Sequence, residues 1–318
     1  MKTIDVHTAS IIINDYEQGD CPKLENCFKM YDMITHTYFY IGMIYNKDKK
    51  QLILPRGIDL WWVQSNFPDY KLNFIEPEEF AYFEKDVKMK YGPRDDRQKE
   101  ALRFMLGINE YSRNKDFSQL MINLNTGAGK TSVYTMAFEK IKSIVITYSN
   151  GWLKQWKDCI MEYTDMEENR IHQIKGAEAI NMLLSGRSKY QNCDIFLVTH
   201  STLKSYGDTY GWDKITKLFK LLKIGMSFID EAHLNFTNIC DISAYTNIYK
   251  TYYITATPAR SNENENRIYQ LSMKNIPKIE LFDENNDPHT DYIAIKWSSK
   301  PTPQQISDCR NAYGLDRN

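Results

Sequence analysis

The pattern of apolar and polar positions has one rhythm before residue 85 and another after it. In the first part, short segments mix alternating apolar residues with apolar residues at helical spacing. A polar stretch of hairpin length, residues 46–50, separates two extended segments. These features predict a small α+β domain over residues 1–85. The expected elements are strands at 3–7, continuing into the apolar 11–13, and at 38–45, 51–54 and 71–75, with helices at 23–34 and 58–66.

After residue 85, short β-rich apolar segments alternate with helical ones. The charged stretch 84–98, with Gly92-Pro93 in its middle, marks the boundary. Buried strands separated by helices form βαβ units and a parallel sheet that is covered on both faces. We therefore expect an α/β domain over residues 86–278 and a different segment over 279–318. The expected elements are strands at 120–124, 143–147, 194–198, 226–229 and 251–255, helices through residue 140 and at 152–163, and a late strand at 292–297 before a linker at 301–303.

Composition and charge narrow the class of protein. Of the 318 residues, 42% are hydrophobic and 25% charged, as in folded globular proteins, which excludes collagen-like and disordered classes. The net charge of −1 gives no global attraction to nucleic acid or to an anionic membrane, so a polyanion needs a local groove. The six cysteines form no paired motif and are expected to be reduced. Without a signal core or a membrane-length apolar segment, the chain is expected in the cytoplasm, or the host cytoplasm if viral.

A glycine-rich loop, residues 125–131, directly follows the expected strand 120–124. Strand, loop and helix N-terminus form a cradle in which backbone N–H groups turn toward phosphates. Lys130 would reach the β- and γ-phosphates, and the Thr131 hydroxyl would bind Mg²⁺. Leu124 replaces the first glycine of the usual pattern. A solvated turn that opens an ordinary helix is the alternative. The expected nucleotide-binding residues of the loop are Thr126, Gly127, Ala128, Gly129, Lys130 and Thr131.

Two carboxylates, Asp230 and Glu231, follow the apolar strand 226–229. Open α/β sheets place their ligands at the carboxyl ends of the strands, so this position suits a metal and a base. Asp230 would hold Mg²⁺, while Glu231 would polarise the water that attacks the γ-phosphorus. The alternative is an exposed acidic pair that caps the next helix. Together with Lys130, these carboxylates are the expected catalytic residues.

Three segments in this order resemble the motifs of superfamily-two nucleic-acid helicases and translocases. The loop 125–131 looks like motif I, Asp230-Glu231-Ala232-His233 reads as a DEAH box, and Thr255-Ala256-Thr257 is similar to motif III. The resemblance implies a RecA-like P-loop domain that binds ATP and Mg²⁺. It also implies that Thr255 and Thr257 couple hydrolysis to nucleic acid and that His233 contacts a second motor domain.

Weaker resemblances assign three further residues. Gln98, in the segment 94–98, is similar in position to the glutamine that reads adenine in the family, with a charged helix start as the alternative. Thr147 and Thr199 lie in segments similar to motif Ia and to a later motif that contacts the nucleic-acid backbone. Such loops hold phosphates independently of sequence. An ordinary strand end is the alternative for both threonines.

A small α+β domain before a compact DEAH motor is similar to UvsW-like phage repair and recombination helicases. The segment 54–57, Leu-Pro-Arg-Gly, adds to this likeness. A role for residues 1–85 in nucleic-acid recognition follows only from their position. The aromatic residues Trp61, Trp62 and Phe67 would suit base stacking, but in a short helix of a small domain we expect them in the core.

The chain contains no Gln-x-x-Gly-Arg-x-x-Arg pattern, which in this superfamily belongs to the second motor domain and its arginine fingers. We therefore expect the N-terminal half of a helicase, with residues 279–318 as a linker and the start of the missing domain. Because an arginine finger contributes about 10³–10⁵ to the rate in related NTPases, turnover by this half should be weak.

The expected function is that of an ATP-dependent DNA helicase or translocase in repair, recombination or replication, here with only its ATP-binding half. The expected partner of this monomeric chain is branched or duplex DNA, with RNA left open and no membrane. Two alternatives remain. One is an RNA helicase or the translocating subunit of a restriction system, and the other is a non-enzymatic module in which ATP gates nucleic-acid binding.

Overall fold

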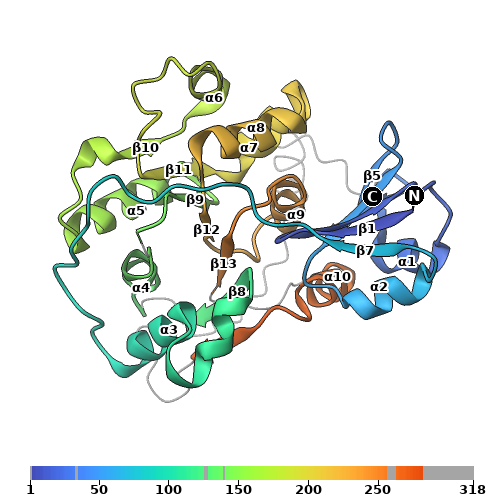
Figure 1. The fold of residues 1–318 in the computed structure, drawn as a ribbon, viewed down its shortest axis with the longest axis horizontal. Helices are drawn as coiled ribbons and strands as arrows, with labels where there is room; N and C mark the ends of the chain where they lie inside the picture. Colours follow the sequence, from blue (N-terminus) through green and yellow to red (C-terminus); the bar gives the residue numbers. More distant parts are fainter. Residues whose placement is uncertain (1, 33–34, 125–127, 139, 256–262, 282–318) are drawn as a thin grey trace, which may run out of the picture. The chain divides into compact units, whose positions relative to one another are not determined.

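The computed structural model describes residues 2–32, 35–124, 128–138, 140–255 and 263–281 (Figure 1). The chain divides into two compact units, Met1–Phe282 and Asp283–Asn318, and every described residue belongs to the first. The strand and the linker expected at 292–297 and 301–303 therefore lie outside the described residues.

A parallel sheet of seven strands forms the larger part of the described fold. Its strands are β8 (Gln119–Leu124), β9 (Ser143–Thr147), β10 (Ile171–Gln173), β11 (Ile195–Thr199), β12 (Met226–Ile229), β13 (Lys250–Thr255) and β14 (Lys278–Leu281). They lie in the order β10-β11-β9-β12-β13-β8-β14, and all neighbours pair in parallel. The predicted α/β fold and its five expected strands are confirmed. The edge strands β10 and β14 were not predicted, because they are short and partly polar and show no clear period.

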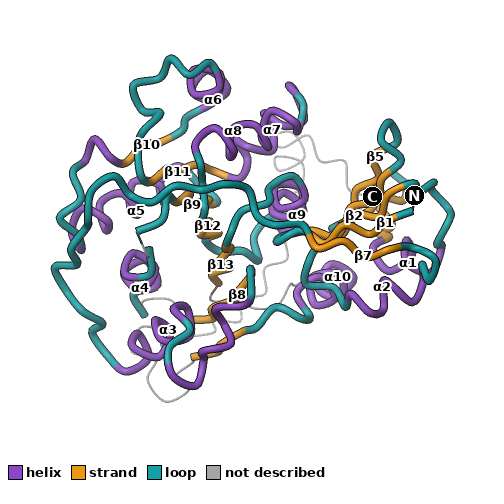
Figure 2. The backbone as a smooth tube through the Cα atoms, in the orientation of Figure 1, coloured by secondary structure: helices purple, strands orange, loops and turns teal. Residues whose placement is uncertain are grey.

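Helices cover both faces of this sheet (Figure 2). They are α3 (Asp96–Leu106), α4 (Lys130–Met136), α5 (Asn150–Tyr163), α6 (Gly176–Leu184), α7 (His200–Tyr210), α8 (Trp212–Leu222), α9 (Phe236–Ala244) and α10 (Glu263–Met273), with 3₁₀ turns at Asn109–Asp116 and Glu168–Arg170. Alternate strand residues point into two cores. Val145 and Phe228 pack with α3, α4 and α5, whereas Ile144 and Tyr253 pack with α6 to α10. None of the described helices has the length and apolar character needed to cross a membrane.

Helix α4 ends at Met136, although the sequence predicted a helix through residue 140. Phe138 and Ile141 are both buried in the core that α3, α4 and α5 share. Between them, Lys140 takes a left-handed backbone conformation with a φ of 60°. The chain leaves the helix early because both apolar side chains must reach this core before β9 begins.

Residues 2–74 form a second sheet of five strands, a separate hairpin and two short helices. The elements are β1 (Thr3–Val6), β2 (Ser10–Asn14), α1 (Pro22–Phe28), β3 (Lys29–Asp32), β4 (Thr37–Tyr40), β5 (Ile44–Asn46), β6 (Gln51–Pro55), α2 (Leu60–Asn66) and β7 (Lys71–Phe74). The sheet order is β5-β6-β2-β1-β7, antiparallel except between β1 and β7, while β3 and β4 pair only with each other. The α+β character and the hairpin between β5 and β6 agree with the sequence.

Two expected elements in this part differ from the prediction. The helix expected at 23–34 ends at Phe28, and the chain continues as β3, because Tyr31 pairs directly with Tyr38 across the hairpin with ring centroids 5.1 Å apart. The single strand expected at 38–45 is divided at Gly42, whose φ of 73° interrupts the extended conformation.

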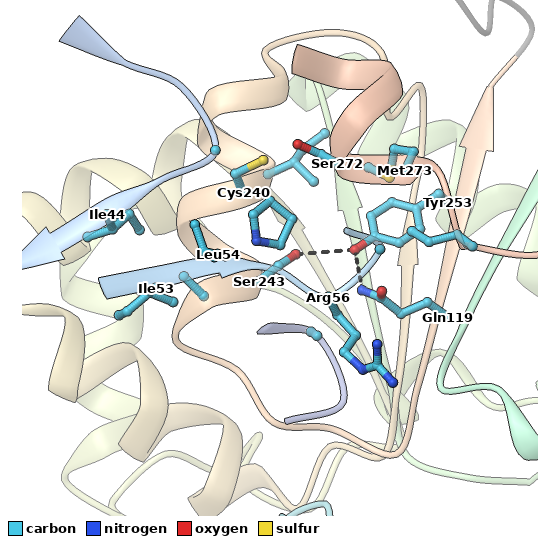
Figure 3. A pocket seen from close by; sticks show the side chains of 17 residues that line it. Ile44, Ile53, Leu54, Arg56, Gln119, Cys240, Ser243, Tyr253, Ser272 and Met273 are labelled. Carbon is cyan, nitrogen blue, oxygen red and sulfur yellow. Dashed lines mark hydrogen bonds between the residues drawn. The ribbon is translucent and has the colours of Figure 1, made fainter. Parts of the chain in front are cut away.

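The five-stranded sheet shares a hydrophobic core with one face of the parallel sheet. Ile11 of β2 and Leu54 of β6 lie in the same buried cluster as Ile239 of α9 and Tyr269 of α10. Figure 3 shows this junction, where a cavity of about 20 Å³ has room for about one water molecule. The domain boundaries at residues 85 and 278 stay predictions.

The aromatic residues of the α2 region differ in burial. Phe67 is buried and Trp62 is half-buried, as expected of core residues, but Trp61 is 73% exposed. Val63 faces the core, and a residue two positions earlier lies on the opposite side of a helix. The prediction that Trp61 belongs to the core is therefore wrong.

Candidate nucleotide-binding site

The parallel strands bring the expected site residues to one edge of the sheet. Because β8, β9, β11, β12 and β13 all end there, the edge carries Ala128, Gly129, Lys130, Thr131, Thr147, Thr199, Asp230, Glu231, His233 and Thr255. Ligands of open α/β sheets bind at this edge. Three expected residues, Thr126, Gly127 and Thr257, lie outside the described residues.

Gln98 holds the start of α4 close to α3. Its side-chain N–H donates to the carbonyl of Ala128 (2.8 Å), and its amide oxygen accepts from the backbone N–H of Arg94 (2.8 Å). Gly129 has a left-handed φ of 77°, and a Cβ there would lie 2.4 Å from Gln98 Nε2. The left-handed backbone favours glycine at position 129, and a larger residue there would have to displace the Gln98 side chain, which holds Ala128 at the start of α4. The expected role of Gln98 in reading adenine stays a prediction.

Lys130 and Glu231 form an ion pair, with Nζ 2.5 Å from Oε1. Their side chains are only 13% and 18% exposed, so water and salt screen the pair weakly. The other carboxylate oxygen of Glu231 lies 3.3 Å from Nδ1 of His233, which in turn lies 2.7 Å from the hydroxyl of Thr255. A continuous series of polar contacts thus joins the glycine-rich loop, the Asp-Glu-Ala-His segment and the end of β13.

Asp230 is held by an indole. Trp156 of α5 donates its Nε1–H to Asp230 Oδ2 (2.8 Å), and the backbone N–H of Glu231 donates to Oδ1 (3.1 Å). Burial raises the pKa of Asp230, and the hydrogen bond from Trp156 and the charge of Lys130 only partly oppose the rise. Asp230 is therefore a desolvated carboxylate whose charge a nearby cation would stabilise.

Trp156 and its neighbour Tyr134 were not predicted as site residues. The two rings stack with centroids 6.2 Å apart and planes inclined by 19°. Tyr134 of α4 is fully buried, and its hydroxyl has no hydrogen-bond partner in the described structure. From the sequence, Trp156 lies in the expected helix 152–163 and closes the segment 147–156 that is similar to motif Ia, without a role of its own. The signal that could have identified Trp156 is its indole N–H, because a buried indole usually donates a hydrogen bond to a nearby acceptor.

The oxygen atoms at this edge suit Mg²⁺. Asp230 offers a carboxylate, and Thr131, in the first turn of α4, offers a hydroxyl. Proteins commonly bind Mg²⁺ through one or two such oxygens, with waters and substrate phosphates completing the shell. Among the described residues, no group of three or more His, Cys, Asp or Glu side chains is arranged to hold a metal. The donor set therefore fits a metal that arrives together with a nucleotide.

Thr147 and Thr199 are buried and bonded locally. The Thr147 hydroxyl donates to the carbonyl of Ser149 (3.1 Å), and the Thr199 hydroxyl accepts from the N–H of Thr202 (3.2 Å) at the start of α7. Both contacts are those of strand-end residues, and their contact with a nucleic-acid backbone stays a prediction. Between the two strand ends, the neighbouring Tyr148 is exposed.

We expect Asp230→Asn to raise the melting temperature of the chain while it removes the carboxylate that is expected to bind a metal. Because the folded-state pKa of Asp230 is raised by burial, its charge opposes folding at neutral pH, and asparagine still accepts from Trp156. The gain, on the order of 2 °C, should fade as the pH falls through that raised pKa, where the native aspartate becomes neutral. Thermal unfolding without metal, from neutral to acidic pH, measures it. A lower melting temperature at neutral pH would contradict the expectation.

The parallel sheet, with Gly129, Lys130 and the Asp-Glu pair at its carboxyl edge, defines the P-loop, RecA-like domain of a nucleic-acid helicase. The chain belongs to the family described as type III restriction enzyme, res subunit, whose profile matches residues 91–260, slightly more than half of the chain. This match includes every motif that resembles the superfamily-two helicases, and that resemblance is confirmed.

This chain is also similar to one curated protein and to one solved structure. The putative DNA 3'-5' helicase Rad25 of Haloarcula marismortui is 26% identical over 197 residues, which cover 60% of this chain and 28% of that protein. The match thus spans less than a third of the curated relative's length. The crystal structure of the UvsW helicase from bacteriophage T4 matches with a TM-score of 0.52 and 16% identity, covering 88% of this chain and 100% of that one. At this identity the likeness shows the fold.

Proposed function

We propose that this chain is the ATP-binding half of an ATP-dependent DNA helicase or translocase. The Lys130–Glu231 ion pair beside Asp230 carries the proposal, because a lysine and two carboxylates at one edge of the sheet are the groups that would bind phosphates, act as a base and bind a metal. The choice of DNA is supported by the description of the Rad25 relative as a DNA helicase. We place this activity in repair, recombination or replication.

Each side chain has its own role in this proposal. Lys130 releases Glu231 and binds the β- and γ-phosphates of ATP. Thr131 and Asp230 hold Mg²⁺, which neutralises charge on the phosphates when it is bound. Trp156 keeps the Asp230 carboxylate in place through its indole hydrogen bond. Glu231, once free of Lys130, orients and polarises the attacking water as a general base.

His233 and Thr255 connect this chemistry to the rest of the chain. Because His233 contacts both Glu231 and Thr255, a movement of Glu231 on nucleotide binding would reach the end of β13. We assign nucleotide binding to residues 86–278 and nucleic-acid recognition to residues 1–85. No residue in this assignment acts as an arginine finger, so we propose weak turnover by the chain alone.

We expect Lys130→Ala to weaken binding of Mg·ATP at least tenfold, or about 1.4 kcal/mol. The variant loses the ammonium group that the loop holds at the expected phosphate position. Titration with a fluorescent ATP analogue measures the affinity. Lys157→Ala is the matched control, because Lys157 also forms a 2.5 Å ion pair, with Glu168, away from this edge. Equal affinities of the two variants would reject the proposal.

A restriction-type translocating subunit is the second candidate, and the family's description favours it. Both candidates act on DNA, whereas an RNA helicase would not. Competition of unlabelled DNA and RNA against labelled duplex DNA, at one stated salt concentration, separates these classes, because phosphate contacts dominate affinity and depend on salt. A preference for RNA would reject the assignment to DNA.

A further inference from the structure

Two adjoining hollows lie where the five-stranded sheet meets the amino end of β8. Their volumes are about 390 and 270 Å³, and both are lined by Arg56, Asp116, Phe117 and Ser118. We call the pair the Arg56 groove. Ser118 directly precedes β8, so the groove lies at the opposite edge of the parallel sheet from Lys130 and Glu231. It is therefore separate from the nucleotide-binding site.

Arg56 is a partly buried cation that has no partner among the described residues. Its guanidinium makes no hydrogen bond or ion pair in the described structure, and burial lowers the pKa of Arg56 with no carboxylate opposing it. Its backbone is fixed, since its N–H donates to the carbonyl of Ala9 (3.2 Å). Figure 3 shows the side chain directed away from the hydrogen bonds that join Ser243, Tyr253 and Gln119. A phosphate would supply the charged acceptor that Arg56 lacks.

Three of the aromatic side chains that line this groove are exposed to solvent. Trp61 of α2 is 73% exposed in the larger hollow, and Phe74 of β7 is 68% exposed in the smaller one. Phe117, which is 42% exposed, belongs to both. Exposed aromatic rings beside a cation are the features with which proteins stack the bases and hold the backbone of a single strand.

The acidic groups of the groove argue for a single strand over a duplex. Asp59 uses its carboxylate to cap α2 at Trp61 and Trp62, but Glu76 and Asp116 also line the hollows. A duplex presents rows of phosphates and would bring several of them near these carboxylates. A flexible single strand can place one phosphate on Arg56 and turn its bases to the aromatic rings.

We propose that the Arg56 groove binds single-stranded DNA, with Arg56 on a backbone phosphate and with Trp61, Phe117 and Phe74 against bases. This inference rests on the proposed function and deepens it, because it gives residues 1–85 a defined contact with the nucleic acid. The strand is then held at the edge of the sheet that lies opposite the nucleotide.

The test is fluorescence anisotropy of a labelled oligothymidine, titrated with the unsubstituted chain and its variants at several salt concentrations. Trp61→Ala should weaken binding roughly 5- to 150-fold, since one stacked base contributes about 1–3 kcal/mol. Arg56→Gln should weaken binding about tenfold. It should also make the slope of the logarithm of the binding constant against the logarithm of the salt concentration shallower by about 0.7, the value for one lost phosphate contact on a single strand. Arg56→Lys should keep most of that salt dependence.

Matched controls are Tyr82→Ala, which removes an aromatic ring that is 65% exposed elsewhere, and Arg187→Gln, which removes an exposed arginine after α6. Both should bind as the unsubstituted chain does. Thermal unfolding checks the fold of each variant, and the exposed Trp61 gives a substitution that the fold tolerates. If Arg56→Gln fails to fold, the affinity of Trp61→Ala and a crosslinking experiment test the groove assignment instead. Ultraviolet crosslinking with halogenated pyrimidines should label Trp61.

The outcomes separate this inference from the proposed function. If the unsubstituted chain binds no nucleic acid, the proposed function fails. If it binds the oligonucleotide but the Trp61 variant matches the Tyr82 control, the groove assignment is overturned. An equal loss for duplex and single-stranded DNA, or crosslinks confined to the carboxyl edge near Tyr148, would also overturn it.

Discussion

Glu231→Gln should lower the rate of ATP hydrolysis by about 10²–10⁴ while leaving ATP binding intact or tighter. In the structure, the Glu231 carboxylate holds the ammonium group of Lys130, with the two atoms 2.5 Å apart. The same carboxylate is the base that the proposed reaction needs. Glutamine keeps the shape of the side chain but removes its charge and its ability to accept a proton from water.

The direction of the binding change follows from the same ion pair. ATP must replace Glu231 as the partner of Lys130, and the carboxylate also repels the incoming phosphates. Removing the charge eliminates both effects, so we expect affinity to rise by up to about tenfold, or about 1.4 kcal/mol. Binding and hydrolysis should therefore change in opposite directions.

Single-turnover hydrolysis with the protein in excess, together with titration of an ATP analogue, measures the two effects separately. Asp241→Asn is the matched control. Asp241 of α9 is 17% exposed, close to the 18% of Glu231, and it pairs with Lys204 at 3.3 Å. We expect this control to hydrolyse ATP as the unsubstituted chain does. A Glu231 variant that loses binding in proportion to hydrolysis would show that the residue is structural.

The central strands were predictable because full burial leaves continuous apolar segments in the sequence. The strands β9, β12 and β13 are buried at every residue. The edge strand β10, with the sequence Ile-His-Gln, is buried only at Ile171 and so gave no such signal. Local conformations that depend on distant packing were also not predictable, such as the early end of α4 beside the buried Phe138.

In the site, the residues that follow strand ends were predictable, and the contacts between distant segments were not. Lys130 begins the helix after β8, and Asp230 and Glu231 come directly after β12. Because these strands are parallel, their carboxyl ends bring the three residues to one edge of the sheet. Trp156 lies 74 residues from Asp230 in the sequence, and no local pattern relates the two. The exposure of Trp61 likewise depends on which side of α2 packs on the core.

Gly57→Ala should destabilise the chain by about 2–3 kcal/mol, through overpacking at the junction of the two sheets. A Cβ at Gly57 would lie 2.3 Å from the carbonyl oxygen of Ser272 in α10 and 2.8 Å from Ile276 Cγ1. The first neighbour is backbone and cannot rotate away. The carbonyl of Gly57 also accepts from the N–H of Asn275 (2.9 Å), so any displacement that relieves the clash disturbs this hydrogen bond.

Thermal unfolding should show the loss as a melting temperature lower by roughly 5–10 °C. Gly92→Ala is the matched control, because a Cβ at Gly92 would have no heavy atom within 4 Å. It should leave the melting temperature unchanged or slightly higher, since alanine restricts the unfolded chain. A Gly57 variant that melts within a degree or so of this control would contradict the close packing at the junction.

The shape of the transition carries a second argument. Ile11 and Leu54 share a core with Ile239 and Tyr269, so we expect the Gly57 variant to unfold in one shifted transition, as a single cooperative unit does. Two separate transitions would instead mean that residues 1–85 fold on their own. Gly57 adjoins Arg56, whereas the ATP site lies at the opposite edge of the sheet. The variant should therefore lose more affinity for single-stranded DNA than for ATP.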